Sequence, residues 1–304
     1  MSQRMRVLHM QRNLEEVKGL LDKISDQGFT HVKVGPLQPC LRFTNNRNEW
    51  YWDYQPLYFN IGNHYGDIYD LCELNDEAHK RGIQIITDVV IRHVAGQPNN
   101  PLYPSEEADI EMTSKRDYWM PPIEHSENVP DWRYQMAYRC YGLPCINYNN
   151  QEVLDRFIFS LLDDVLAFCD GIRIDMGQHF ALPSEGSTFW NQIAKRYSHK
   201  LVIAECCYLN ADYVRKYSAY CLPHVENYTI TGPFEGLHSY ETHDTYLNFG
   251  GRTRNDDTNK ILNEYAALCN RYAKTEFYAR PGKEDWKDVS VKAANMKWEW
   301  EGMK

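Results

Sequence analysis

The sequence predicts an α/β protein built as a (β/α)8 TIM barrel with a long insertion after the third strand. Three observations support this prediction. Short apolar segments rich in β-branched residues alternate with segments whose apolar residues recur at helical spacing. The sequence contains no GxGxxG or Walker-type loop, which would favour an open doubly wound sheet. The 304 residues accommodate a barrel of about 250 residues and one insertion.

The first third of the chain supplies three strands and two helices in alternation. Leu14 and Val17 open a series of apolar residues at helical spacing, and Gly28 can end that helix. The third strand is the most β-branched run of the chain. The predicted strands cover residues 6–9, 31–34 and 83–91, and the predicted helices cover residues 14–27 and 68–80.

The second half of the chain resumes this alternation after residue 150. We predict helices over residues 153–168, 188–197, 211–217 and 258–273. We predict strands over residues 171–174, 201–204, 237–241 and 275–279. The sixth strand and its helix must fall within residues 221–237, which look short for both.

Residues 94–150 break the periodicity and are rich in proline, aromatic and Asn or Asp residues. This stretch is too long for an ordinary connection within a compact barrel. We therefore predict an inserted subdomain over residues 94–150. The barrel itself would be discontinuous, formed by residues 1–93 and 151–304.

Composition excludes several classes of function. The formal net charge is −9, so nucleic acid and anionic membranes are not expected partners. The nine cysteines show no CxxC pair with metal-binding spacing, which favours reduced thiols and a cytoplasmic protein over a disulfide framework. No signal peptide is recognisable at the first residues, and no apolar run is long enough to span a membrane.

Three carboxylates lie where predicted strands end and loops begin: Asp175, Glu205 and Asp244. Active sites of (β/α)8 barrels form at the C-terminal ends of the strands, from side chains of several strands. Pairs of carboxyl groups at such a site suit the cleavage of glycosidic bonds.

Arg173 lies two residues before Asp175 and faces the same side of the strand. The guanidinium should lower the pKa of Asp175 and keep this carboxylate ionised as a nucleophile. A purely structural buried Arg–Asp pair is the alternative. Glu205 follows an apolar strand, where a raised pKa would suit a general acid and base. Its alternative role is an ion pair with a neighbouring basic residue.

Histidine and aromatic residues are further candidates for sugar binding. His243 and Asp244 could bind hydroxyl groups together, although the motif taken alone favours a loop pair at the surface. His93 and His179 could instead be satisfied, partly buried imidazoles. The aromatic run over residues 50–56 offers ring faces for sugar C–H groups, with core filling as its alternative.

Taken together, these motifs resemble glycoside hydrolase family 13, the α-amylase family, from about residue 10 to residue 285. Four segments resemble the family's four strand-end motifs, and two more resemble its Tyr-Gln-Pro segment and the motif at the end of its domain B. These segments are Asp88-Val-Val-Ile-Arg-His93, Gly171-Ile-Arg-Ile-Asp175-Met-Gly-Gln-His179, Ala204-Glu205, His243-Asp244, Tyr54-Gln55-Pro56 and Leu143-Pro-Cys-Ile-Asn147.

The resemblance implies a retaining mechanism with two carboxyl groups about 5–5.5 Å apart. It implies that Asp175 is the nucleophile, Glu205 the acid and base, and Asp244 the stabiliser of the distorted sugar. It also implies that Arg173 orients and ionises Asp175. The candidate substrate-binding residues are Tyr51, Tyr54, Gln55, His93, Arg173, His179 and His243.

Two departures from the family pattern concern calcium. The family usually has Asn at the position of Arg92 and Asp at the position of Cys145, and both commonly bind calcium. A guanidinium offers no oxygen donor and repels the ion. We therefore expect no calcium at this site, no metal ligands and no cofactor. We also expect that the Arg92 cation braces domain B against the barrel.

About 25 residues follow the predicted eighth strand, too few for the β-sandwich domain C that usually follows this barrel. The function expected from the resemblance is a retaining hydrolase acting on α-glucans or malto-oligosaccharides. The same triad could serve a transglycosylase or an isomerase. A non-catalytic carbohydrate-binding barrel is a further alternative, although all three carboxylates are present. The sequence does not specify the oligomeric state.

Overall fold

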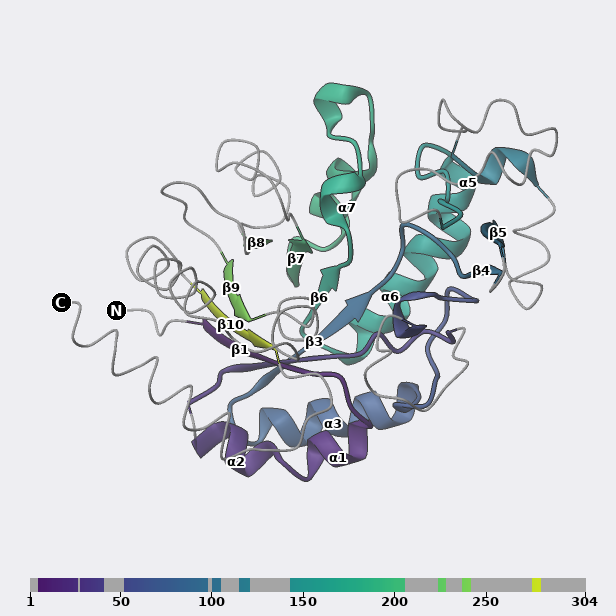
Figure 1. Ribbon diagram of the computed structural model, residues 1–304. Helices are drawn as coiled ribbons and strands as arrows, with labels where there is room; N and C mark the ends of the chain where they lie inside the picture. Colours follow the sequence, from purple (N-terminus) through teal and green to yellow (C-terminus); the bar gives the residue numbers. More distant parts are fainter. Residues whose placement is uncertain are drawn as a thin grey trace, which may run out of the picture.

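The computed structural model describes nine segments of the chain, and the account that follows refers to them. They are residues 5–26, 28–40, 52–97, 100–104, 115–120, 143–205, 224–227, 237–241 and 275–279. Eight strands within these segments form a closed barrel in the order β1-β10-β9-β8-β7-β6-β3-β2 (Figure 1). Neighbouring strands pair in parallel all the way around the barrel.

The barrel strands lie where the sequence predicts them. They are β1 (Met5–Met10), β2 (His31–Val34), β3 (Gln84–Val89), β6 (Gly171–Ile174), β7 (Leu201–Glu205), β8 (His224–Asn227), β9 (Leu237–Glu241) and β10 (Thr275–Ala279). The sixth barrel strand, β8, lies within residues 221–237, where the sequence predicts it. The prediction of a parallel α/β sheet is thus confirmed.

The described helices lie outside the ring of strands (Figure 1). They are α1 (Leu14–Lys18), α2 (Leu21–Asp26), α3 (Ile68–His79), α5 (Gln151–Val153), α6 (Ser160–Phe168) and α7 (Phe189–Arg196). Asp67 caps α3 by accepting from the backbone N–H groups of Tyr69 and Asp70. The helices predicted over 211–217 and 258–273 lie outside the described residues.

Two predicted helices differ in detail from the structure. The prediction of one helix over residues 14–27 was wrong, because α1 ends at its C-cap Gly19 and α2 begins at Leu21. Glycine is a poor residue for a helix interior, which explains the break. The helix predicted over 153–168 contains a π-helical segment, η5 (Leu154–Phe159), between α5 and α6.

The segment between β3 and β6 contains a small antiparallel sheet of its own, formed by β4 (Gly96–Gln97) and β5 (Asn100–Pro104). Figure 1 shows this sheet beside the barrel rather than within it. Residues 143–148 return to the end of β3, where His93 forms a β-bridge with Cys145 and the N–H of Ile146 donates to the carbonyl of Arg92 at 3.0 Å. The division into a barrel and an inserted subdomain over 94–150 remains a prediction.

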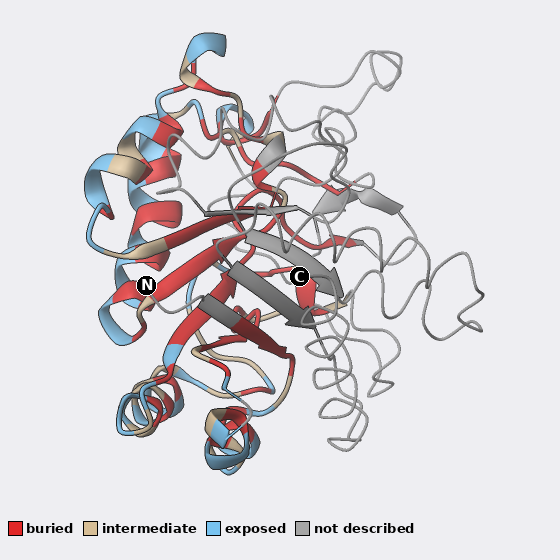
Figure 2. Cartoon of the chain, turned by 90° about the vertical axis from the view of Figure 1, so that its left-hand side faces the viewer, coloured by how far each residue is buried: buried red, intermediate tan, exposed pale blue. Residues whose placement is uncertain are grey.

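Apolar side chains fill two regions of the barrel. The larger core lies between the strands and the helices, whose buried faces point toward the sheet and whose outer faces are exposed (Figure 2). A smaller cluster joins Val7, Ile86 and Ile203. These residues come from β1, β3 and β7, which are not neighbours, so they meet across the barrel interior. Within the described segments, no helix combines the length and apolar character needed to cross a membrane.

Candidate active site

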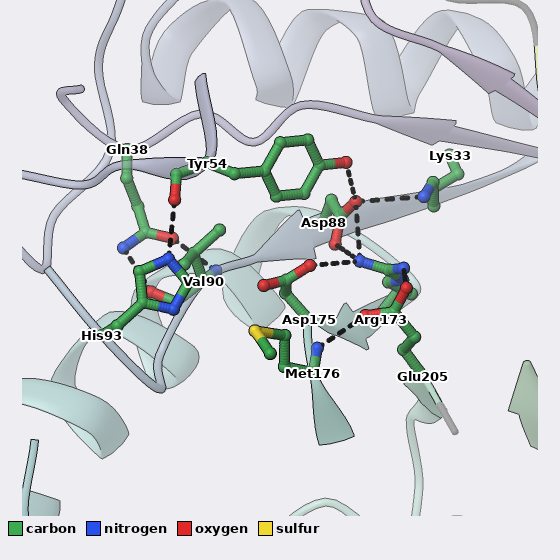
Figure 3. Close-up of polar contacts among 10 residues, drawn as sticks. All are labelled: Lys33, Gln38, Tyr54, Asp88, Val90, His93, Arg173, Asp175, Met176 and Glu205. Atoms are coloured by element: carbon green, nitrogen blue, oxygen red, sulfur yellow. Dashed lines mark hydrogen bonds and ion pairs between the residues drawn. The ribbon is translucent and has the colours of Figure 1, made fainter. Parts of the chain in front are cut away.

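The candidate catalytic carboxylates lie together at the C-terminal ends of β6 and β7 (Figure 3). Asp175 directly follows β6, and Glu205 is the last residue of β7. Because the two strands are parallel neighbours, their carboxyl ends meet on the same side of the barrel. Both residues are buried, at 6% and 5% relative exposure.

One guanidinium binds both carboxylates. Arg173 Nη1 lies 2.9 Å from Asp175 Oδ1, and Nη2 lies 2.5 Å from Glu205 Oε1. The same Nη1 lies 3.1 Å from Oδ1 of Asp88, the register partner of Arg173 on β3. The structure therefore contains the buried Arg–Asp pair that was the structural alternative. The geometry also places Arg173 where it orients the two candidate catalytic groups.

The pKa of Asp175 differs from one expectation. Burial, and next the negative charge of Glu205, raise the pKa of Asp175 well above its usual range, while Arg173 opposes this shift. The expectation that Arg173 would leave this pKa lowered was therefore wrong in its net direction. Its physical reason is that burial, and next the negative charge of Glu205, outweigh the contact with Arg173, which also binds Glu205 and Asp88. Asp175 consequently keeps its proton to higher pH than an exposed aspartate does.

The third carboxylate of this network, Asp88, is held by two other side chains. Lys33 Nζ lies 3.0 Å from Asp88 Oδ2, and the hydroxyl of Tyr54 donates to the same oxygen at 2.7 Å. Sequence reasoning missed the role of Lys33. A signal was present, because a lysine between valines on a short apolar strand needs a buried counter-charge.

Glu205 has a second fixed contact from the loop after β6. Met176 adopts a left-handed backbone conformation with φ 52°, and its N–H donates to Glu205 Oε2 at 2.7 Å. The next residue, Gly177, packs so closely on β7 that a Cβ atom would lie 2.9 Å from the Ala204 Cβ and 3.0 Å from the Glu205 carbonyl oxygen. The turn Met176–Gly177 therefore fixes the position of Glu205, at the cost of backbone strain.

His93 links the end of β3 to the aromatic segment before α3. Its Nε2 lies 2.8 Å from the carbonyl oxygen of Tyr54. A carbonyl only accepts, so this nitrogen carries the hydrogen and donates. Burial lowers the pKa of His93 to about 4, and the charges of Arg92 and His179 add to the effect. His93 is thus a neutral imidazole at neutral pH.

The structure describes only some of the other candidate residues. Gln55 is half-buried on the segment that follows Tyr54, and His179 is half-buried at the end of a 3₁₀ turn over Gly177–His179. Tyr51, His243 and Asp244 lie outside the described residues. Tyr54, one of the candidate substrate-binding residues, is 7% exposed and uses its hydroxyl to bind Asp88.

Gln38 is a further contributor that sequence reasoning missed. Its Nε2 donates to the carbonyl of Val90 at 2.9 Å, and its Oε1 accepts from the N–H of the same residue at 2.7 Å. This double hydrogen bond fixes the backbone just after β3, between Asp88 and His93 (Figure 3). A glutamine in a loop after a strand carries no sequence signal for such a contact.

Comparison with known proteins agrees with this geometry. The family model for the catalytic domain of α-amylase matches residues 14–249. An α-amylase of Clostridium acetobutylicum is 30% identical over 173 residues, which cover 55% of this chain and 22% of that protein. The α-amylase Mde5 of Schizosaccharomyces pombe is 26% identical over 181 residues, covering 57% of this chain and 34% of that protein. The chain thus spans only about a fifth to a third of these two relatives.

Solved structures show the same fold at low sequence identity. The α-amylase of Geobacillus thermoleovorans, solved in complex with acarbose, has a TM-score of 0.63 at 16% identity, covering 98% of this chain and 78% of that one. An α-amylase of Malbranchea cinnamomea has a TM-score of 0.63 at 19% identity, covering 99% and 73%. With the family model spanning most of its length, the chain belongs to the α-amylase family of glycoside hydrolases.

Proposed function

We propose that this protein is a retaining glycoside hydrolase that cleaves α-glucosidic bonds in α-glucans or malto-oligosaccharides. The observation that carries the proposal is the shared guanidinium of Arg173, which binds Asp175 and Glu205 at 2.9 and 2.5 Å. This contact brings two buried carboxyl groups together at the C-terminal end of a parallel barrel. A nucleophile and a general acid placed this way are what a double-displacement mechanism requires.

The electrostatic influence of Glu205 on Asp175 suits that mechanism. Catalysis requires one ionised carboxylate, Asp175, to attack the anomeric carbon and one protonated carboxyl, Glu205, to protonate the departing oxygen. The charge of Glu205 is one cause of the raised pKa of Asp175, so protonation of Glu205 removes that repulsion and favours an ionised Asp175. Arg173 stays in contact with Asp175 and favours its ionised form. Glu205 then acts as base and activates the water that releases the sugar.

The substrate class is inferred from relatives. The Geobacillus enzyme was solved with acarbose, and a variant of an Eisenia fetida α-amylase was solved with maltohexaose, at TM-scores of 0.63 and 0.61. We extend this α-glucan class to the present chain. Asp244 would complete the site by holding sugar hydroxyl groups, with His243 beside it.

The residues at the family's calcium position do not fit that ion. Arg92 is fully buried, and its guanidinium lies 5.0 Å from the ring centroid of Tyr148 and 5.7 Å from that of Phe180. The thiol of Cys145 donates to the carbonyl of Leu143 at 3.4 Å. Calcium prefers hard oxygen ligands, and neither side chain supplies one. We therefore propose that catalysis needs no calcium and that the Arg92 cation holds residues 146–148 against the barrel.

The test is reducing-sugar release from a panel of α-glucans and malto-oligosaccharides in the presence of EDTA. Wild type should be active, and Asp175→Ala should lose at least about four orders of magnitude in rate, as expected for loss of a nucleophile. Asp155→Ala changes an exposed aspartate that lies 3.6 Å from Arg196 on the outer surface, and it should keep full activity. No turnover of any substrate by wild type would favour a non-catalytic carbohydrate-binding barrel.

Product analysis separates hydrolysis from transfer. NMR of the first product should show the α-anomer, because a double displacement retains configuration. Products longer than the substrate would indicate that a sugar rather than water attacks the glycosyl-enzyme, as in a transglycosylase. An inverted first product would exclude Asp175 as the nucleophile.

A further inference from the structure

Three potential metal-ligating side chains converge in the loops that precede α3, apart from the catalytic carboxylates. Cys40 Sγ lies 3.8 Å from Asp53 Oδ1, and His64 Nε2 lies 3.4 Å from the same oxygen. All three ligand atoms lie within 4.8 Å of one another. In a tetrahedral zinc site with ordinary bond lengths, the ligand atoms are separated by about 3.3–3.6 Å. The two distances to Asp53 Oδ1 are close to this range, and Cys40 and His64, at most 4.8 Å apart, can approach each other to complete it.

The central carboxylate is held by its other oxygen. Asp53 is fully buried, and its Oδ2 accepts from Gln11 Nε2 at 2.8 Å and from the hydroxyl of Tyr65 at 2.5 Å. These two bonds direct Oδ1 toward Cys40 and His64. Metal-ligating carboxylates are typically oriented by hydrogen bonds of this kind from a surrounding layer of side chains.

The backbone that carries the cluster is also fixed. Cys40 forms an antiparallel β-bridge with Pro56, and the N–H of Leu57 donates to the carbonyl of Pro39 at 2.8 Å. The ring of His64 lies against that of Tyr65, with centroids 3.9 Å apart. Because His64 is exposed and Asp53 is buried, the cluster has a solvent-facing side through which an ion can enter.

We propose that Cys40, Asp53 and His64 form a binding site for one borderline divalent transition-metal ion such as Zn²⁺, with water in the fourth position. A thiolate, an imidazole and a carboxylate are the ligands zinc prefers, whereas calcium and magnesium avoid sulfur. This site lies apart from the family's calcium position at Arg92. It replaces the expectation that the chain has no metal ligands.

The position of the site gives the ion a structural role. Asp53 immediately precedes Tyr54, which donates to Asp88 and accepts from His93. An ion bound to Asp53 would fix the short helical turn over residues 52–54 relative to the loops at Cys40 and His64. It would thereby hold Tyr54 in place beside the candidate active site without contacting a substrate.

The experiment is a Co²⁺ titration of the full chain after removal of metals with EDTA, monitored by absorption. Bound Co²⁺ should show a thiolate-to-metal charge-transfer band in the near ultraviolet and visible bands typical of tetrahedral geometry, saturating at one ion per chain. Zn²⁺ should displace it and raise the melting temperature, and Ca²⁺ should do neither. These readouts are independent of catalysis, so failure of the proposed hydrolase activity would not affect them.

Matched variants identify the ligands. Cys40→Ser should abolish the charge-transfer band, and His64→Gln should weaken Co²⁺ binding at least tenfold. Gln11→Ala, which removes one bond that orients Asp53, should weaken binding on the order of 10- to 100-fold. The controls are Cys72→Ser and His79→Gln, which change a free cysteine and a histidine outside the cluster and should leave binding unchanged.

Two outcomes would overturn the proposal. One is the absence of saturable Co²⁺ or Zn²⁺ binding in wild type, which would leave the cluster as a His64–Asp53 ion pair beside a thiol. The other is a charge-transfer band that persists in Cys40→Ser, which would assign the thiolate to another cysteine.

Discussion

Lys33 Nζ lies 3.0 Å from Asp88 Oδ2 inside the barrel, and both side chains are completely buried. Asp88 also binds Arg173, so Lys33 supplies the second positive charge of a network that contains three carboxylates. Arg173 alone could not compensate Asp88, Asp175 and Glu205. The lysine thus leaves more of the guanidinium's charge for the two candidate catalytic groups.

Replacing Lys33 with methionine should therefore both destabilise the protein and change its pH profile. Removing one partner of a buried ion pair costs about 3–5 kcal/mol, because the other charge stays buried and unpaired. The free energy of unfolding in urea should fall by that amount. The pKa of Asp175 should rise further, since the net negative charge around it increases. The acid limb of the pH–rate profile should accordingly move to higher pH.

Lys18→Met is the matched control for this change. Lys18 lies 3.0 Å from Glu73 on the protein surface, where water screens the pair. It should leave both the unfolding free energy and the pH profile almost unchanged. Equal losses in the two variants would show that Lys33 has no special electrostatic role.

The strained turn after Asp175 allows a second prediction. Met176 has φ 52°, and its N–H bonds Glu205. Met176→Gly should raise the unfolding free energy by up to about 1 kcal/mol, because glycine adopts the left-handed region without strain. Met176→Val should lower it by at least about 1 kcal/mol, because a β-branched residue is poorly tolerated there.

Activity should follow the N–H of residue 176 rather than its side chain. Met176→Gly keeps the hydrogen bond to Glu205 and should retain most of the hydrolysis rate. Met176→Val should lose activity along with stability, as the turn relaxes away from φ 52°. If the glycine variant lost activity while the valine variant kept it, the side chain would be the functional part of Met176.

Much of the barrel could be predicted because strands such as β3, β6 and β7 are short runs rich in β-branched residues with clear ends. β2, β6, β9 and β10 occupy the predicted residues, since glycine, charged residues or predicted helices bound them. The positions of Asp175 and Glu205 followed from the same pattern, because a parallel barrel gathers its strand ends at one side.

What could not be predicted depends on contacts between distant residues. Lys33 and Asp88 are 55 positions apart, and nothing local marks them as partners. The net direction of the Asp175 pKa required knowing that its side chain is buried and that Glu205 lies beside it. Cys40, Asp53 and His64 all lie in the connection between β2 and α3, but their spacing matches no metal-binding motif.

A third prediction concerns Arg92, which we propose holds residues 146–148 against the barrel. Its guanidinium is buried against Tyr148 and Phe180 and donates to the carbonyl of Ile146 at 3.5 Å. Arg92→Met keeps most of the side-chain volume but removes the charge. Loss of a desolvated cation–π contact should lower the unfolding free energy by at least about 2 kcal/mol. Added Ca²⁺ should not restore the stability of this variant.

Arg196→Met provides the comparison for Arg92→Met. The Arg196 guanidinium lies 4.2 Å from the ring centroid of Phe159, but its side chain is 40% exposed. A solvated contact of this kind contributes about 0.5–1 kcal/mol. We therefore expect Arg196→Met to lower the unfolding free energy less than Arg92→Met does. An Arg92→Asn variant that loses no stability and needs no calcium would contradict the bracing role.

The neutral imidazole of His93 makes stability depend on pH, in a direction fixed by its pKa. Burial lowers that pKa from 6.5 to about 4, so the unfolded chain binds a proton in this range and the folded protein does not. Stability from this residue is complete above pH 6.5 and falls by about 3 kcal/mol as the pH drops to 4.

His93→Gln keeps an N–H donor for the Tyr54 carbonyl but cannot titrate. Urea unfolding at pH 7 and pH 4 should thus show a loss about 3 kcal/mol smaller in this variant than in wild type. His79→Gln changes an exposed histidine beside Asp170 and should show the same loss of unfolding free energy between pH 7 and pH 4 as wild type. If His93→Gln also showed the wild-type loss, His93 would be charged in the folded protein.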